Sequence, residues 1–126
     1  MSLLFSFFAL LFGFLPGLVL ANFQGAQSKA DDVVSKNDIN AMYQKLEEHY
    51  NENGEYPTVK ELAEEYDQQL PGIDTEALID ASDKFINEDG GDYSYSPTNC
   101  SAVGCEHYTI SALLQDGTTY SKQSLN

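Results

Sequence analysis

Arginine and tryptophan are absent from this 126-residue chain, so its only basic side chains are six lysines and two histidines. Against them stand 20 acidic residues, which gives a formal net charge of −14. Binding to a nucleic-acid duplex requires clustered lysine and arginine, so this composition argues against direct nucleic-acid binding. The same charge repels anionic lipid headgroups, so any membrane attachment must come from apolar residues.

Histidine and cysteine are scarce, which limits metal sites and catalysis. The chain has only His49, His107, Cys100 and Cys105, and they do not form a zinc-binding pattern. Neither histidine adjoins a glycine-flanked nucleophile, and no phosphate-binding loop or dinucleotide fingerprint is present. We therefore predict no catalytic residue, cofactor, metal or small-molecule substrate, and hence no enzyme activity.

The two cysteines are a candidate disulfide. Four residues separate Cys100 from Cys105. In an exported protein this pair would close a small loop and stabilise the fold by roughly 2 kcal/mol. The alternative is two free thiols in a surface loop.

Charged residues are missing from the start of the chain, where residues 1–21 form an apolar segment. As a helix, Leu3–Ala21 would span about 28 Å, close to the hydrocarbon thickness of a bilayer. The residues Val19-Leu20-Ala21 are of a kind that a signal peptidase accepts, but no lysine or arginine precedes the segment. A lasting anchor and a cleaved signal therefore both stay open. A bend is predicted at the helix breakers Gly13, Pro16 and Gly17.

Residues 22–53 have the pattern of an amphipathic helix. Apolar residues recur at three- and four-residue spacing, and we expect the stripe from Val33 to Tyr50 to face a core. Asn53-Gly54 provides a left-handed exit and Pro57 prevents the helix from resuming. Because nothing interrupts the pattern after Ala21, the apolar and amphipathic parts are predicted to form one rod of up to about 50 residues.

Residues 54–92 are predicted to hold short helices and loops. Thr58 and Glu61 form a capping-box pattern, "LPGID" ends that helix, and Asp74 or Thr75 caps a second turn. An acidic, glycine-containing loop follows. Its oxygen-bearing residues do not fit an EF-hand, so we favour a solvated turn over the alternative of a non-standard calcium site. The candidate calcium ligands are Asp83, Asn87, Asp89 and Asp92.

Residues 93–126 alternate between apolar and polar residues, as β-strands do. "DYSYS", "HYTISALLQ" and "TTYSKQSL" are predicted strands, and Asp116-Gly117 suits a tight turn between the second and third. The second strand would place Tyr108, Ile110, Ala112 and Leu114 on one face. We therefore predict an α+β fold in which a long N-terminal helix, apolar and then amphipathic, packs on a three- to four-stranded antiparallel sheet with a Cys100–Cys105 loop.

Together these features resemble the type IV pilin and pseudopilin subunits. The resemblance covers Ala21–Asn126, and its most specific part is "LEEHYNENGEYPT", in which an Asn-Gly helix exit leads at once into Tyr56-Pro57-Thr58. The strand motifs "YSYSP" and "YTISALLQDGTTY", the paired cysteines and the final "SLN" add to it. In that family the N-terminal helix holds the precursor in the inner membrane and later packs in the centre of a filament.

The resemblance implies that residues 1–21 are a transmembrane and filament-core segment. It implies other copies of the chain or related pilin subunits as partners, along with the inner membrane and the pilus assembly machinery. The expected location is a single-pass membrane protein that moves into an extracellular surface filament. The residues assigned to the assembly and membrane helix are Leu4, Phe5, Phe8, Leu11, Phe12, Phe14 and Pro16.

The first residues differ from the family pattern. A basic leader, a processing-site glycine and Phe-Thr-Leu-x-Glu are expected, whereas "MSLLFSFFALL" has none of these and the first acidic residue is Asp31. A mis-assigned start, an altered 5′ coding region and a divergent minor subunit each account for the difference. The expected function is a structural subunit of a type IV pilus or pseudopilus, serving attachment, motility, DNA uptake or secretion. The alternative is a monomeric secreted or membrane-anchored binding or adhesion module.

Overall fold

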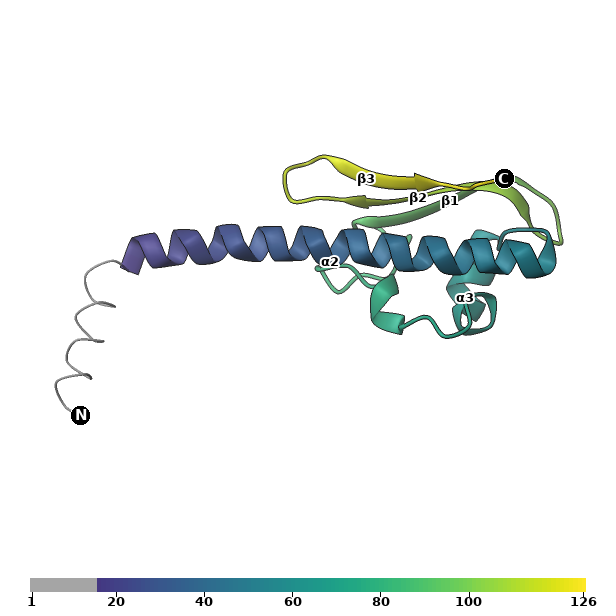
Figure 1. Ribbon diagram of the computed structural model, residues 1–126, viewed down its shortest axis with the longest axis horizontal. Helices are drawn as coiled ribbons and strands as arrows, with labels where there is room; N and C mark the ends of the chain where they lie inside the picture. Colours follow the sequence, from purple (N-terminus) through teal and green to yellow (C-terminus); the bar gives the residue numbers. More distant parts are fainter. Residues whose placement is uncertain (1–15) are drawn as a thin grey trace. The chain divides into compact units, whose positions relative to one another are not determined.

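The computed structural model describes the backbone of residues 16–126 and the side chains of residues 27–126 (Figure 1). Among these described residues, no helix combines the length and the apolar character needed to cross a bilayer. Pro16 is the first residue of α2, and the other assembly residues lie outside the described part. Of the residues at which a bend was predicted, Gly13 lies outside the described part, and Pro16 and Gly17 are the first two residues of α2, so the bend stays a prediction. The undescribed assembly residues are Leu4, Phe5, Phe8, Leu11, Phe12 and Phe14.

The fold is α+β, as predicted, with a long helix and an antiparallel sheet of three strands in the order β1-β2-β3. Residues 31–126 form one compact unit. Within it, the strands run along the C-terminal part of α2 (Figure 1). The elements are α2 (Pro16–Asn53), α3 (Val59–Gln69), the 3₁₀ turn η1 (Thr75–Leu78), β1 (Tyr93–Cys100), β2 (Cys105–Leu113) and β3 (Thr119–Gln123).

The predicted end of the long helix is confirmed. α2 ends at Asn53, and Gly54 follows with φ of +76°, a left-handed conformation that glycine adopts without a steric cost. The Gly54 amide still donates to the carbonyl of Tyr50 at 2.7 Å, which closes the last turn. The chain then reverses into Tyr56 and Pro57, both of which are buried.

Both predicted helix starts after this exit are confirmed. The Thr58 hydroxyl accepts from the Glu61 amide at 3.1 Å, and the Glu61 carboxylate accepts from the Thr58 amide at 3.2 Å. This reciprocal pair satisfies two amides that would otherwise lack partners at the start of α3. Asp74 caps η1 by accepting from the Glu76 amide at 3.1 Å.

The sheet follows the predicted alternation, with shifted strand ends: β2 begins at Cys105 and ends at Leu113, and β3 ends at Gln123. β1 continues beyond "DYSYS" to Cys100, which pairs directly with Cys105 at the start of β2. The predicted turn is confirmed, since Gly117 has φ of +87° and the Asp116 carboxylate accepts from the Thr118 amide at 2.9 Å. Tyr108, Ile110 and Ala112 are buried on the face of β2 that packs on the core. The prediction was wrong for Leu114, which lies just beyond the end of β2 and is only partly buried.

The core joins α2 to the sheet. The buried stripe of α2 was predicted to begin at Val33, but it begins later in the helix. Ile39, Met42 and Leu46 are fully buried, each contributing about 1.5–3 kcal/mol. Val33 and Val34, which were expected to face the core, are more than half exposed. At about 100° per residue, both valines point roughly 120–140° away from the direction of Ile39. The apolar rhythm changes phase between these positions, so the prediction for the two valines was wrong.

Side chains of the acidic loop hold its backbone. The buried Asp80 carboxylate accepts from the amides of Ser82, Lys84 and Asp92 at 2.8, 3.0 and 2.6 Å. Asn87 pairs with the backbone of Tyr95 in both directions, at 2.8 and 3.0 Å. The loop is therefore fastened to the outer edge of β1.

Candidate functional site

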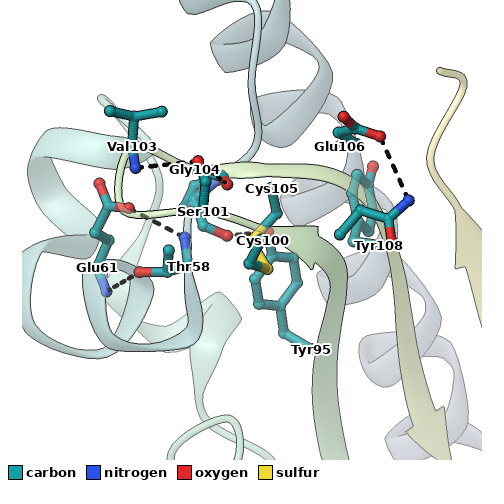
Figure 2. The surroundings of a disulfide bond; sticks show 12 residues. Thr58, Glu61, Tyr95, Cys100, Ser101, Val103, Gly104, Cys105, Glu106 and Tyr108 are labelled. Carbon is teal, nitrogen blue, oxygen red and sulfur yellow. Dashed lines mark hydrogen bonds between the residues drawn. A yellow bond between two sulfur atoms is a disulfide. The ribbon is translucent and has the colours of Figure 1, made fainter.

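The disulfide lies at the tip of the β1–β2 hairpin, next to the exit of α2 (Figure 2). Cys100 and Cys105 are bonded, which confirms the predicted disulfide and excludes the free-thiol alternative. Cys105 is buried, whereas Cys100 is exposed. The bond therefore connects the core to the tip of the hairpin.

The same cysteine connects the hairpin to the helix exit. The Tyr56 amide donates to the Cys105 carbonyl and the Cys105 amide donates to the Tyr56 carbonyl, each at 2.8 Å. Beside this bridge, a Cβ placed on Gly104 would lie 2.7–2.9 Å from side-chain atoms of Glu55. Only glycine allows so close an approach at this point. The "GEYPT" segment and the disulfide hairpin thus form one joint.

The Glu47 carboxylate contacts two tyrosines of this joint, and among the described side chains it forms no ion pair with a basic residue. Glu47 of α2 accepts from the Tyr56 hydroxyl at 2.8 Å and from the Tyr108 hydroxyl at 2.7 Å. The Asn126 side chain donates to the Tyr56 hydroxyl at 3.1 Å. Burial raises the pKa of Tyr56 to about 12, and burial followed by the Glu47 contact raises the pKa of Tyr108. Both hydroxyls therefore stay protonated and serve as donors at neutral pH.

Four tyrosine rings surround the joint. Tyr50 and Tyr56 have ring centroids 4.6 Å apart, Tyr56 and Tyr108 lie 4.7 Å apart, and Tyr108 and Tyr95 lie 5.6 Å apart. Pairs at such distances contribute about 0.5–1.5 kcal/mol beyond the area that they bury. The Tyr95 hydroxyl donates to the Pro57 carbonyl at 2.7 Å, which adds a further link to the helix exit.

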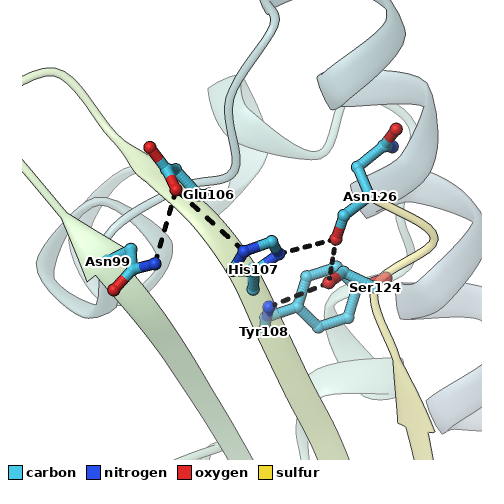
Figure 3. A network of polar contacts seen from close by, with 6 residues as sticks. All are labelled: Asn99, Glu106, His107, Tyr108, Ser124 and Asn126. Carbon is cyan, nitrogen blue, oxygen red and sulfur yellow. Dashed lines mark hydrogen bonds and ion pairs between the residues drawn. The ribbon is translucent and has the colours of Figure 1, made fainter.

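The two histidines contact polar groups at the surface. His107 Nδ1 lies 2.7 Å from the Asn126 backbone oxygen and Nε2 lies 4.0 Å from the Glu106 carboxylate (Figure 3). The Ser124 hydroxyl accepts from the Tyr108 amide at 3.2 Å and donates to the Asn126 oxygen at 3.0 Å (Figure 3). These contacts fix the chain end against β2. On α2, His49 Nδ1 lies 3.3 Å from the Asn53 amide nitrogen.

Within residues 27–126, no group of three or more His, Cys, Asp or Glu side chains is arranged to hold a metal ion. Of the candidate calcium ligands, Asn87 uses its amide on the Tyr95 backbone. The arrangement of this region supports a role in holding α2, α3 and the sheet together.

The contacts of three residues were not predicted. Glu47 lies beside the buried stripe of α2 and carries no sequence signal beyond its position next to Leu46. Asp80, within the predicted turn "TEALIDAS", accepts from backbone amides, and Asn87, which was predicted only as a candidate calcium ligand, pairs with the backbone of Tyr95. Asp80 directly follows the apolar residues of "ALID". A short polar residue in such a position indicates a side chain that hydrogen-bonds the backbone of the following loop.

Comparison with known proteins adds no assignment: no protein-family model, curated protein or solved structure matches this sequence.

Proposed function

We propose that this protein is a structural subunit of a surface filament of the type IV pilus or pseudopilus kind. In this proposal the apolar segment, residues 1–21, first anchors the chain in a membrane and then packs with the same segment of neighbouring subunits. The unit formed by residues 31–126 is the part exposed on the filament. Polymerisation through a shared apolar helix needs no cofactor or substrate.

The observation that carries the proposal is the length of α2 relative to the core that it serves. α2 runs as one helix from Pro16 to Asn53, and its first buried side chain among those described is Ser35. The domain core takes its α2 contribution from Ile39, Met42 and Leu46. The described side chains from Gln27 to Val34 precede this first buried residue, and we infer that this part of the helix serves contacts other than the packing of its own domain.

The joint at the α2 exit also supports the proposal. The Tyr56-Pro57-Thr58 segment, which carries the resemblance most specifically, is fixed by the two backbone hydrogen bonds to Cys105. A staple of this kind resists local opening of the hairpin tip. That property suits a unit that remains outside the cell, where disulfides persist.

The test is assembly of the full chain. The purified chain is taken up in a neutral detergent, the detergent is removed by dialysis, and the product is followed by sedimentation and negative-stain electron microscopy. We expect fibres from the unmodified chain. Phe8→Asp should abolish them, because burying an unpaired charge between apolar helices is costly.

The matched control is Val103→Asp, a substitution of the same kind at a side chain that is 70% exposed. It should leave the fibres intact, and circular dichroism should show that both variants fold. The proposal is wrong if the unmodified chain stays monomeric at every concentration, or if Phe8→Asp assembles as well as Val103→Asp. It is also wrong if the exported protein begins at Asn22, as the monomeric alternative expects.

A further inference from the structure

A groove of about 480 Å³ runs between α2 and the segment that contains η1. Part of its lining is apolar, formed by Val34 and Ala41 of α2 together with Ala77 and Ile79. Val34 is 55% exposed, so the groove presents apolar surface to solvent. No side chain of the described unit covers Val34 to the extent that Ile39 or Met42 is covered.

Carboxylates stand around this apolar surface. Asp38 of α2, Asp74 and Glu76 of the η1 turn, and Asp83 line the groove. None of the described residues that line it is a lysine, in a chain that has only six. The groove therefore combines an apolar surface with charged side chains that are all negative.

Asp38 marks the point where these charges converge. Its carboxylate accepts from the Tyr93 hydroxyl at 2.7 Å, which fixes its position within the groove. Burial raises the pKa of Asp38, the Tyr93 hydrogen bond lowers it, and the negative charges of Asp74 and Glu76 raise it again. Repulsion among these three carboxylates is relieved when a positive charge enters.

We propose that this groove binds a basic segment of another protein, with a lysine or arginine of that segment inserted between α2 and η1. The aliphatic stem of such a side chain packs on Val34 and Ala77 while its charged end reaches Asp38, Asp74 and Glu76. Charge complementarity of this kind speeds association and selects the partner. The proposal does not depend on filament assembly.

Other occupants fit less well. A metal ion would need a cluster of ligands, and no described group of three acidic, histidine or cysteine side chains is so arranged. A second copy of this chain would bring a net charge of −14 against a negative groove. An anionic membrane surface would be repelled for the same reason.

The test measures binding of a fluorescein-labelled amphipathic peptide of lysine and leucine to the full chain in neutral detergent, by fluorescence anisotropy. The groove variant combines Asp38→Asn, Asp74→Asn and Glu76→Gln. The control variant combines Glu52→Gln, Glu64→Gln and Glu65→Gln, which are exposed and outside the groove and remove the same number of charges. We expect the groove variant to bind about tenfold more weakly and the control less than twofold.

A second variant, Ala41→Leu, fills the groove without changing charge and should also weaken binding. If the triple groove variant fails to fold, the binding affinity of Ala41→Leu tests the proposal. Equal weakening by the groove and control variants would mean diffuse attraction and would overturn the proposal, as would an absence of weakening in Ala41→Leu. If sedimentation shows a dimer of this chain that the groove variants abolish, a second copy is the occupant and the proposal is wrong.

Discussion

The hydroxyl of Tyr108 on β2 donates to the carboxylate of Glu47 on α2 at 2.7 Å, across 61 positions of sequence. Tyr56 donates to the other oxygen of the same carboxylate, so one negative group ties the helix to the sheet and to the helix exit. Hydrogen bonds to a charged acceptor are stronger than neutral ones. The pair fixes how the sheet is seated on the helix.

Removing this hydrogen bond should be costly. We expect Tyr108→Phe to lower the free energy of unfolding by about 1.5–3 kcal/mol, because Glu47 loses a donor. Tyr66→Phe is the matched control, since the Tyr66 hydroxyl contacts Thr75 at 3.3 Å near the surface. It should cost about 0.5 kcal/mol or less. Urea denaturation of both variants checks this, and equal losses would show that the Glu47 contact adds nothing.

Reduction of the Cys100–Cys105 disulfide should destabilise the chain by about 2 kcal/mol, because the reduced hairpin regains freedom when unfolded. The measurement is the urea midpoint with and without dithiothreitol. The Cys100→Ser, Cys105→Ser double variant is the control, and its midpoint should not respond to the reductant. An unchanged midpoint for the unmodified chain would contradict the stabilising role.

Gly104→Ala should destabilise the joint by about 1–3 kcal/mol, because the added Cβ meets Glu55 within 2.9 Å, including the Cβ of that residue. Gly117→Ala is the control, because its position is open although its φ is +87°. Its cost should be that of backbone strain alone, about 1 kcal/mol. Thermal unfolding of the two variants is compared. A larger loss of stability in Gly104→Ala than in Gly117→Ala measures the cost of the contact with Glu55, beyond that of backbone strain. Glu55→Gly combined with Gly104→Ala should recover part of the loss.

Protonation of Asp38 and Asp92 in mild acid should stabilise the folded state. Burial raises the pKa of Asp38 and of Asp92 in the folded state, with Asp74 and Glu76 adding to the first and Asp80 to the second. A raised folded pKa means that the folded state binds protons more readily than the unfolded state. The contribution to stability is therefore fully present below the unfolded pKa and is lost as the pH rises through the folded pKa.

The measurement is the free energy of unfolding between pH 7 and pH 4. It should rise as the pH falls toward the unfolded pKa of aspartate, and Asp38→Asn should flatten this dependence and raise stability at pH 7. The control is Asp67→Asn, which removes one charge at an exposed position on α3. A stability that falls steadily from pH 7 to pH 5 would contradict the assignment.

Much of the fold could be predicted because it depends on local rules. The capping box at Thr58 and Glu61, the exit at Gly54 and the turn at Gly117 each follow from backbone chemistry within a few residues. The alternation that buries Tyr108 and Ile110 is likewise a property of one strand. These features were found in the places where the sequence pattern put them.

The misses concern partners that are distant in sequence. Val33 and Val34 fit an apolar rhythm, yet where the sheet covers α2 depends on strands about 60 to 90 residues later, which local spacing does not encode. Glu47 gave no signal because its donors come from Tyr56 and Tyr108. The acidic groove was missed too, since Asp38 and Glu76 meet only after the chain folds back on α2.

The tyrosine rings around the joint also give the molecule an optical property. With no tryptophan in the chain, ultraviolet excitation stays among tyrosines, and Tyr56 and Tyr108 are near neighbours whose hydroxyls share one carboxylate acceptor. Opening of the joint would separate these two hydroxyls from their shared acceptor, so we expect the tyrosine emission to change when the joint opens, a signal that needs no attached dye.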